Sequence, residues 1–73
     1  MTCRYSMLIQ WSDEDAAFVV TLPEFHGCKT HGDTYEDAAH NGREVLELLV
    51  EAYQAEGRPL PEPTKLGQAV QVV

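Results

Sequence analysis

Hydrophobic and polar residues alternate along the first third of the chain. From Arg4 to Trp11 every second residue is apolar or aromatic, which is the period of a strand with one face on a core. Polar residues cluster over 12–15, and a second alternating stretch covers 17–22. Two alternating stretches joined by a short acidic turn predict a β-hairpin.

A third, short strand is expected after this hairpin. Pro23 lacks a backbone N–H and should end the second strand. Residues 24–27 then form a connection, and 28–30 are long enough for a strand. The segment 31–33 should turn the chain toward a helix.

The helix is the clearest element and should run from about Tyr35 to Glu56. Thr34 and Asp37 have the spacing of a capping box, with Asp in place of Glu or Gln, and Gly57 suits the position beyond the last turn. At about 100° per residue the apolar residues share one arc and the charged residues the other. The apolar arc holds Tyr35, Ala38, Ala39, Gly42, Val45, Leu46, Leu49, Ala52 and Tyr53, and the polar arc holds Glu36, His40, Arg43, Glu44, Glu47, Glu51 and Gln54.

We expect the apolar arc to cover a core made by the first strand. That core should consist of Tyr5, Met7, Ile9 and Trp11. Gly42 costs helix stability, and on the buried face it would let a strand come close. Residues 58–68 form a proline-rich connector, and 69–73 are apolar enough for a final strand.

These elements predict one α+β domain over residues 1–73, ordered β-β-β-α-β, with the helix packed on one face of the sheet. A right-handed crossover through the helix would lay the final strand parallel to a neighbouring strand.

The charge of the chain bears on its partners. Twelve Asp and Glu against five Lys and Arg give a formal net charge of −7. The five cations are scattered: Arg4, Lys29, Arg43, Arg58 and Lys65. Nucleic-acid binding relies on Lys and Arg at phosphates, so we expect no direct nucleic-acid contact. An acidic surface attracts a basic partner instead, and the acidic helix face is either solvated exterior or the surface on which that partner docks.

Size and cysteine content suggest a small cytoplasmic protein that self-associates. A domain of 73 residues has a thin margin of stability and commonly gains more from a partner subunit. We therefore expect a homodimer or higher homo-oligomer, for example through pairing of open sheet edges. Cys3 and Cys28 are too few for a secreted disulfide scaffold. The sequence contains no leader pattern and no membrane-length apolar run.

Candidate chemistry is limited to one histidine–cysteine cluster and some carboxylates. His26, Cys28 and His31 lie close in sequence, but no second ligand pair stands at a zinc-site spacing, with Cys3 and His40 elsewhere. The alternative is a buried thiol between two loop histidines. Cys28 with His31 or His26 is the one candidate nucleophile and base. Carboxylate pairs such as Asp13 with Asp15, and Glu47 with Glu51, fit a solubilising surface. We expect no enzyme activity, metal or cofactor.

The segment from Leu22 to Ala38 reads L-P-E-F-H-G-C-K-T-H-G-D-T-Y-E-D-A. It resembles the HicB-type antitoxin pattern L-P-(D/E)-x-x-G-C-x-(T/S)-x-G-(D/E)-T-x-E-(D/E)-A, and the likeness extends from about Tyr5 to Pro63. The matching positions are Pro23, Gly27, Cys28, Gly32, Asp33, Thr34, Glu36 and Ala38. Gly and Pro shape turns and Thr begins helices, so we interpret this signature as mainly structural.

The resemblance implies a partial ribonuclease-H-like fold without that superfamily's metal-binding carboxylates. It also implies a partner, a small HicA-like toxin that cleaves mRNA with a histidine and is blocked when the antitoxin covers it. Only ten residues follow Pro63, so the carboxy-terminal DNA-binding domain of many family members is not expected. Two alternatives stay open: an orphan oligomeric ligand- or protein-binding domain, and a small metal- or Cys-dependent hydrolase.

Overall fold

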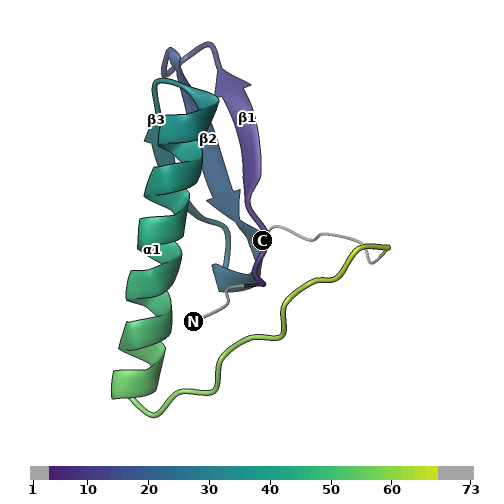
Figure 1. The fold of residues 1–73 in the computed structure, drawn as a ribbon, viewed down its shortest axis with the longest axis vertical. Coiled ribbons are helices and arrows are strands. Elements are labelled where there is room, and N and C mark those ends of the chain that lie inside the picture. Colours follow the sequence, from purple (N-terminus) through teal and green to yellow (C-terminus); the bar gives the residue numbers. More distant parts are fainter. Residues whose placement is uncertain (1–3, 68–73) are drawn as a thin grey trace.

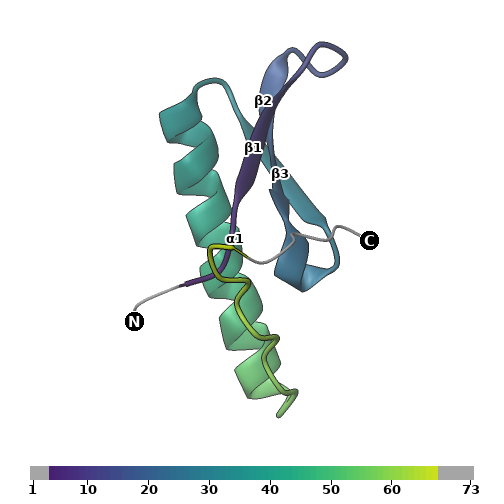
Figure 2. The same ribbon diagram turned by 90° about the vertical axis from the view of Figure 1, so that its right-hand side faces the viewer.

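The computed structural model describes residues 4–67. It contains strands β1 (Leu8–Ser12), β2 (Ala17–Leu22) and β3 (Cys28–Gly32), the short 3₁₀ helix η1 (Pro23–Phe25) and the helix α1 (Tyr35–Ala55). The strands form one antiparallel sheet in the order β1-β2-β3. The helix lies across one face of that sheet; on the opposite face, which we call the open face, the described residues place no second layer of helix or strand (Figures 1 and 2). The expected α+β arrangement is confirmed.

The hairpin forms as expected, but its first strand is shorter. β1 begins at Leu8 rather than at Arg4 and pairs with β2 from Leu8 opposite Thr21 to Ser12 opposite Ala17. The segment before Leu8 leaves the ladder because the backbone N–H of Ser6 donates to the Glu24 carboxylate, at 3.1 Å to each oxygen. A side chain, and not a strand, therefore satisfies this part of the backbone.

The third strand is longer than expected. It reaches from Cys28 to Gly32, so the prediction that His31 and Gly32 belong to a turn is wrong. Glycine at position 32 lets the end of β3 touch the first turn of α1, since a Cβ there would collide with the backbone of Asp37 and Ala38. As expected, β2 ends before Pro23, which opens η1.

Both ends of α1 agree with the expectation to within one residue. The Thr34 hydroxyl caps the amino end by accepting from the Asp37 backbone N–H at 3.0 Å. The last helical residue is Ala55, one before the expected Glu56, which instead forms the cap. Gly57 follows with φ +68°, the left-handed conformation that commonly ends helices.

The core lies between α1 and the central strand. Val20, Leu22, Phe25, Ala38, Leu46 and Val50 are its buried members. A Cβ on Gly42 would lie 2.7 Å from Met7 Sδ and 3.0 Å from Val20 Cγ1. This contact confirms that glycine at position 42 lets the strand side chains come close to the helix.

The predicted burial of two residues of the expected core is wrong. Trp11 is 53% exposed and Met7 is 38% exposed, while Tyr5 and Ile9 are partly buried against the core. The reason is the lateral position of α1, which packs mainly over β3 and β2 and barely reaches β1. For the same reason the apolar arc of α1 is rotated, so that Tyr35 is exposed and Val50 is buried.

The proline-rich connector runs back beside the amino-terminal segment. The Tyr5 hydroxyl donates to the Pro61 carbonyl at 2.8 Å, and the Thr64 N–H donates to Glu24 Oε2 at 2.8 Å. The expected final strand over 69–73 lies outside the described residues.

Candidate functional site

The structure separates the residues of the histidine–cysteine cluster. Cys28 pairs with Leu22 and packs against the core on the helix side of the sheet. Successive strand side chains point to opposite faces, so His31 lies on the open face, away from Cys28. His26 is exposed in the turn before β3, with φ +58°. The arrangement does not place a base beside the thiol, and among residues 4–67 no three His, Cys, Asp or Glu side chains are grouped to hold a metal ion.

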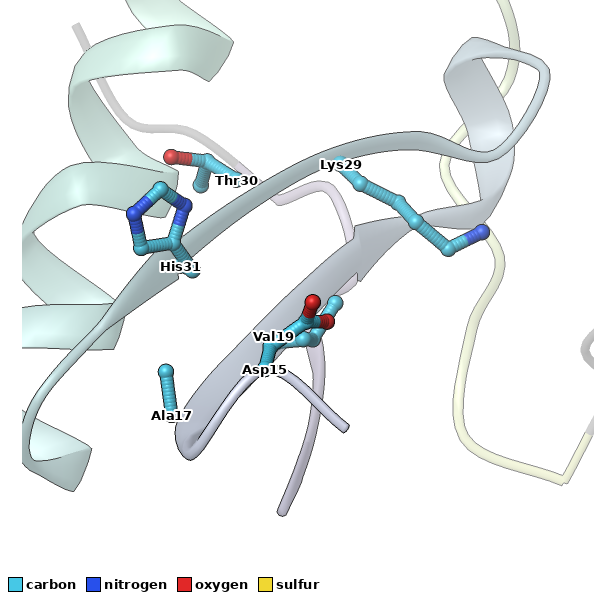
Figure 3. A pocket seen from close by; sticks show the side chains of 6 residues that line it. All are labelled: Asp15, Ala17, Val19, Lys29, Thr30 and His31. Carbon is cyan, nitrogen blue, oxygen red and sulfur yellow. The ribbon is translucent and has the colours of Figure 1, made fainter. Parts of the chain in front are cut away.

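The open face of the sheet carries a shallow depression of about 350 Å³ over β2 and β3. Asp15, Ala17, Val19, Lys29, Thr30 and His31 line it. Figure 3 shows the tips of Lys29 and His31 diverging along β3 instead of converging on one point. Binding sites for small ligands are concave and have converging polar groups, so this face is a poor match for one.

The outer face of α1 is charged and solvated. His40 Nε2 lies 2.6 Å from Glu44 Oε1, and Arg43 Nε lies 3.7 Å from Glu47 Oε1, both as exposed i, i+4 pairs. Such pairs contribute about 0–1 kcal/mol each, so they do little to hold the helix in place. Within the described part of the chain, no helix is long and apolar enough to cross a membrane.

The carboxylates of the hairpin turn are engaged in local hydrogen bonds. Asp13 Oδ1 accepts from the Trp11 indole N–H at 2.8 Å. The Ser12 hydroxyl donates to Asp15 Oδ2 at 3.0 Å and accepts from the Asp15 N–H at 3.2 Å. These bonds shape a turn, and they do not set two carboxylates against each other for acid–base chemistry.

The first signature residues lie around η1 and the start of β3. Pro23 is buried as the first residue of η1, where its missing N–H costs nothing. Gly27 has φ +70°, the region in which glycine is unstrained. Cys28 is a half-buried thiol at the start of β3.

The remaining signature residues lie where β3 meets α1. Gly32 is buried against the first turn, Thr34 caps the helix, and Ala38 is fully buried between them. Asp33 and Glu36 are exposed. Glu36 belongs to the first helical turn, where the helix dipole favours a negative charge.

Glu24 organises the end of the molecule where the amino-terminal segment meets the connector, and no role was expected for it. Its carboxylate accepts from the Ser6 N–H, from the Ser6 hydroxyl at 3.0 Å and from the Thr64 N–H. It therefore joins the amino-terminal segment, η1 and the connector. The signal that could have found it is the acidic position after Pro23 in the signature.

Next to Glu24, three aromatic rings pack in series. We call Tyr5, Phe25 and Tyr53 the closed aromatic cluster. The Tyr5 and Phe25 ring centroids are 4.8 Å apart, and those of Phe25 and Tyr53 are 5.4 Å apart, both edge to face. The Arg58 guanidinium lies over the Tyr53 ring, 4.2 Å from its centroid. This cluster ties the carboxyl end of α1 to η1.

A second set of three aromatic rings lies at the opposite end, where two of the three are exposed to solvent. We call Trp11, Phe18 and Tyr35 the open aromatic cluster. Trp11 contacts Phe18 edge to face at 5.1 Å between centroids, and Phe18 lies 4.2 Å from Tyr35. Tyr35 is 60% exposed. Trp11 was expected in the core and Tyr35 on the buried arc of the helix, and neither was recognised as a surface residue.

Comparison with known proteins gives a consistent family assignment. A family model described as the HicB_like antitoxin of bacterial toxin-antitoxin system matches residues 5–72. A UPF0150 protein of Synechocystis sp. is 34% identical over 59 residues, which cover 81% of this chain and 73% of that protein. A UPF0150 protein of Thermoplasma acidophilum is 31% identical over 58 residues, covering 80% and 83%. No solved structure matches the chain significantly.

Proposed function

Because this chain belongs to the family of HicB-like antitoxins, we propose that it neutralises a HicA-like, mRNA-cleaving toxin by binding it and covering its active site. The family match is the observation that carries this proposal, since it extends over residues 5–72. The matched region contains the whole sheet and α1, so the entire described domain would serve as the binding module.

The charge of the chain supports a basic partner. A toxin that cuts mRNA must approach a polyanion and needs Lys and Arg to do so. The antitoxin carries a formal net charge of −7, which accelerates encounter with such a surface and makes the association salt-sensitive. The same charge opposes direct binding of nucleic acid, so the chain would act on the toxin and not on the RNA.

The arrangement of potential reactive groups supports a binding role. Cys28 and His31 face opposite sides of the sheet, and nucleophilic catalysis would need them within hydrogen-bond reach of each other. Occlusion requires only a stable surface that complements the toxin. We place this function in the cytoplasm, where the toxin meets mRNA.

Self-association would add to the stability of so small a domain. In the described part of the chain, β1 and β3 are the edges of the sheet, and edge strands can pair across a two-fold axis. We infer a homodimer or higher homo-oligomer, which analytical ultracentrifugation of the purified chain tests directly.

An RNA-cleavage assay tests the main proposal. Purified HicA-like toxin is incubated with mRNA and increasing amounts of this chain, and an unrelated acidic protein of similar net charge serves as the control. We expect cleavage to stop near one antitoxin per toxin, while the control leaves it unchanged. Undiminished cleavage at a large excess of the folded chain, tested against toxins from adjacent genes, would contradict the proposal.

A further inference from the structure

The open aromatic cluster has the composition and exposure of a protein-binding anchor. Trp11 and Tyr35 are each more than half exposed, yet both are held in place by ring contacts with Phe18. The indole N–H of Trp11 is further fixed by its 2.8 Å bond to Asp13. Trp and Tyr are among the residues enriched in binding hot spots, and rings that are already ordered lose little entropy when a partner covers them.

Carboxylates crowd the same end of the molecule. The turn between β1 and β2 and the amino end of α1 lie together there (Figure 1). The turn carries three exposed carboxylates and the β3–α1 junction carries three more: Asp13, Glu14, Asp15, Asp33, Glu36 and Asp37. Neither 11–18 nor 32–38 contains Lys or Arg. Half of the acidic residues of the chain are thus at this end, with no cation in either segment.

This combination of chemistry favours one kind of occupant. Exposed aromatic faces attract Arg and Lys through cation–π contacts, and the neighbouring carboxylates can form charge-assisted hydrogen bonds with the same cations. A second copy of this chain would bring six more carboxylates to the surface and would be repelled. A basic protein surface complements both the rings and the charges.

We propose that the open aromatic cluster, with the carboxylates around it, is the surface on which the basic toxin docks. This inference rests on the proposed antitoxin function and adds the location of the interface. Trp11 and Tyr35 would be covered by the toxin, and the carboxylates would form the polar rim that guides and orients it.

Trp11 is the one Trp of the chain, so labelling with 5-fluorotryptophan gives a single ¹⁹F NMR signal from the proposed interface. The probe is an unlabelled HicA-like toxin whose catalytic histidine is replaced by alanine. We expect the signal to shift when the toxin is added. We also expect Trp11→Ala and Tyr35→Ala to weaken binding about tenfold or more by calorimetry, as for interface anchors.

Leu48→Ala is the matched control, because Leu48 is an exposed apolar residue in the middle of α1, away from the cluster. The affinity of this variant for the toxin should stay within about twofold of the affinity of the parent chain, as for residues outside a hot spot. Circular dichroism of each variant establishes that it is folded. Added salt should weaken the complex of the parent chain, because the rim is charged.

Four results would overturn the assignment. If the toxin binds but leaves the Trp11 signal unchanged, and Trp11→Ala and Tyr35→Ala bind it as tightly as the parent chain does, the toxin docks elsewhere and the antitoxin function stands. If the folded parent chain does not bind the toxin at all, both proposals fail. A signal that moves with the concentration of the chain alone places a second copy on the cluster, and a signal that moves on Val70→Asp in the full chain without toxin places residues 68–73 there.

Discussion

The two aromatic clusters contain similar side chains but differ in their exposure and in their surroundings. In the closed cluster Phe25 is 3% exposed, whereas in the open cluster Trp11 is 53% exposed. The closed cluster sits next to a carboxylate that receives backbone hydrogen bonds from two distant segments. The open cluster sits next to carboxylates that are exposed to solvent. One end of the domain is therefore built to hold the chain together, and the other end presents ordered rings to solvent.

The position of α1 over the sheet produces this difference. The helix packs mainly over β3 and β2, so it covers β1 and the segment before it only in part. At the end with the closed aromatic cluster, η1 and the connector hold the segment before β1, through Glu24 and the Tyr5–Pro61 bond. At the open end no described segment completes the cover of Trp11, which stays in water. Exposure here follows from tertiary placement and not from residue type.

The largest expected effect is at the centre of the closed cluster. Phe25→Ala should destabilise the domain by about 3–5 kcal/mol, the cost of truncating a buried Phe. A domain of this size has on the order of 4–11 kcal/mol in total, so much of the variant should be unfolded at room temperature. Urea unfolding followed by circular dichroism measures the loss. Phe25→Leu, which keeps most of the buried volume, is the control and should lose clearly less.

The next effect tests whether Glu24 fastens the closed end. Glu24→Ala removes the acceptor of the Ser6 and Thr64 N–H groups, and leaving part-buried donors unpaired costs about 1–3 kcal/mol. Glu24→Gln retains one oxygen acceptor and should cost less. Hydrogen exchange of the Thr64 amide reports on the contact itself. Unchanged exchange in the alanine variant would show that the connector is held by other means.

The sequence predicts most of this framework. Alternation located β2, and the pattern around Thr34 and Gly57 located α1 to within one residue, because caps and turns are local features. Gly42 was correctly interpreted as a point of close approach. The predictions that failed depend on contacts between residues far apart in the sequence. Nothing local to Ser6 indicates that its N–H serves a carboxylate 18 residues away, so β1 was drawn too long.

The candidate site was harder to predict for a related reason. Alternation assigns Trp11 to the helix side of β1 but does not say how far across the sheet the helix extends, so a surface residue was placed in the core. Cys28 and His31 were named as a candidate nucleophile and base because they lie close in sequence, and His31 was expected in the turn after β3. Once His31 belongs to the strand, its odd spacing from Cys28 puts the two side chains on opposite faces.

A smaller effect is expected at the amino end of α1, which supports the open cluster. Thr34→Ala removes the hydroxyl that accepts from the Asp37 N–H and should cost about 1 kcal/mol. Tyr35 is the first helical residue, so fraying of this turn would loosen its contact with Phe18. Thr34→Ser keeps the cap and should behave like the parent chain. Thermal unfolding gives the stability, and NMR of the ring resonances gives the contact.

The smallest loss of stability is expected from a substitution in the open cluster itself. Trp11→Ala should cost below about 1 kcal/mol, since more than half of the side chain is in water and the loss is mainly its edge contact with Phe18. The measurement is urea unfolding under the conditions used for Phe25→Ala. A loss as large as that of Phe25→Ala would mean that Trp11 is covered in solution, and the two clusters would then both be core. A small loss, joined to a large loss of toxin binding, would mean that the fold keeps Trp11 on its surface for a partner.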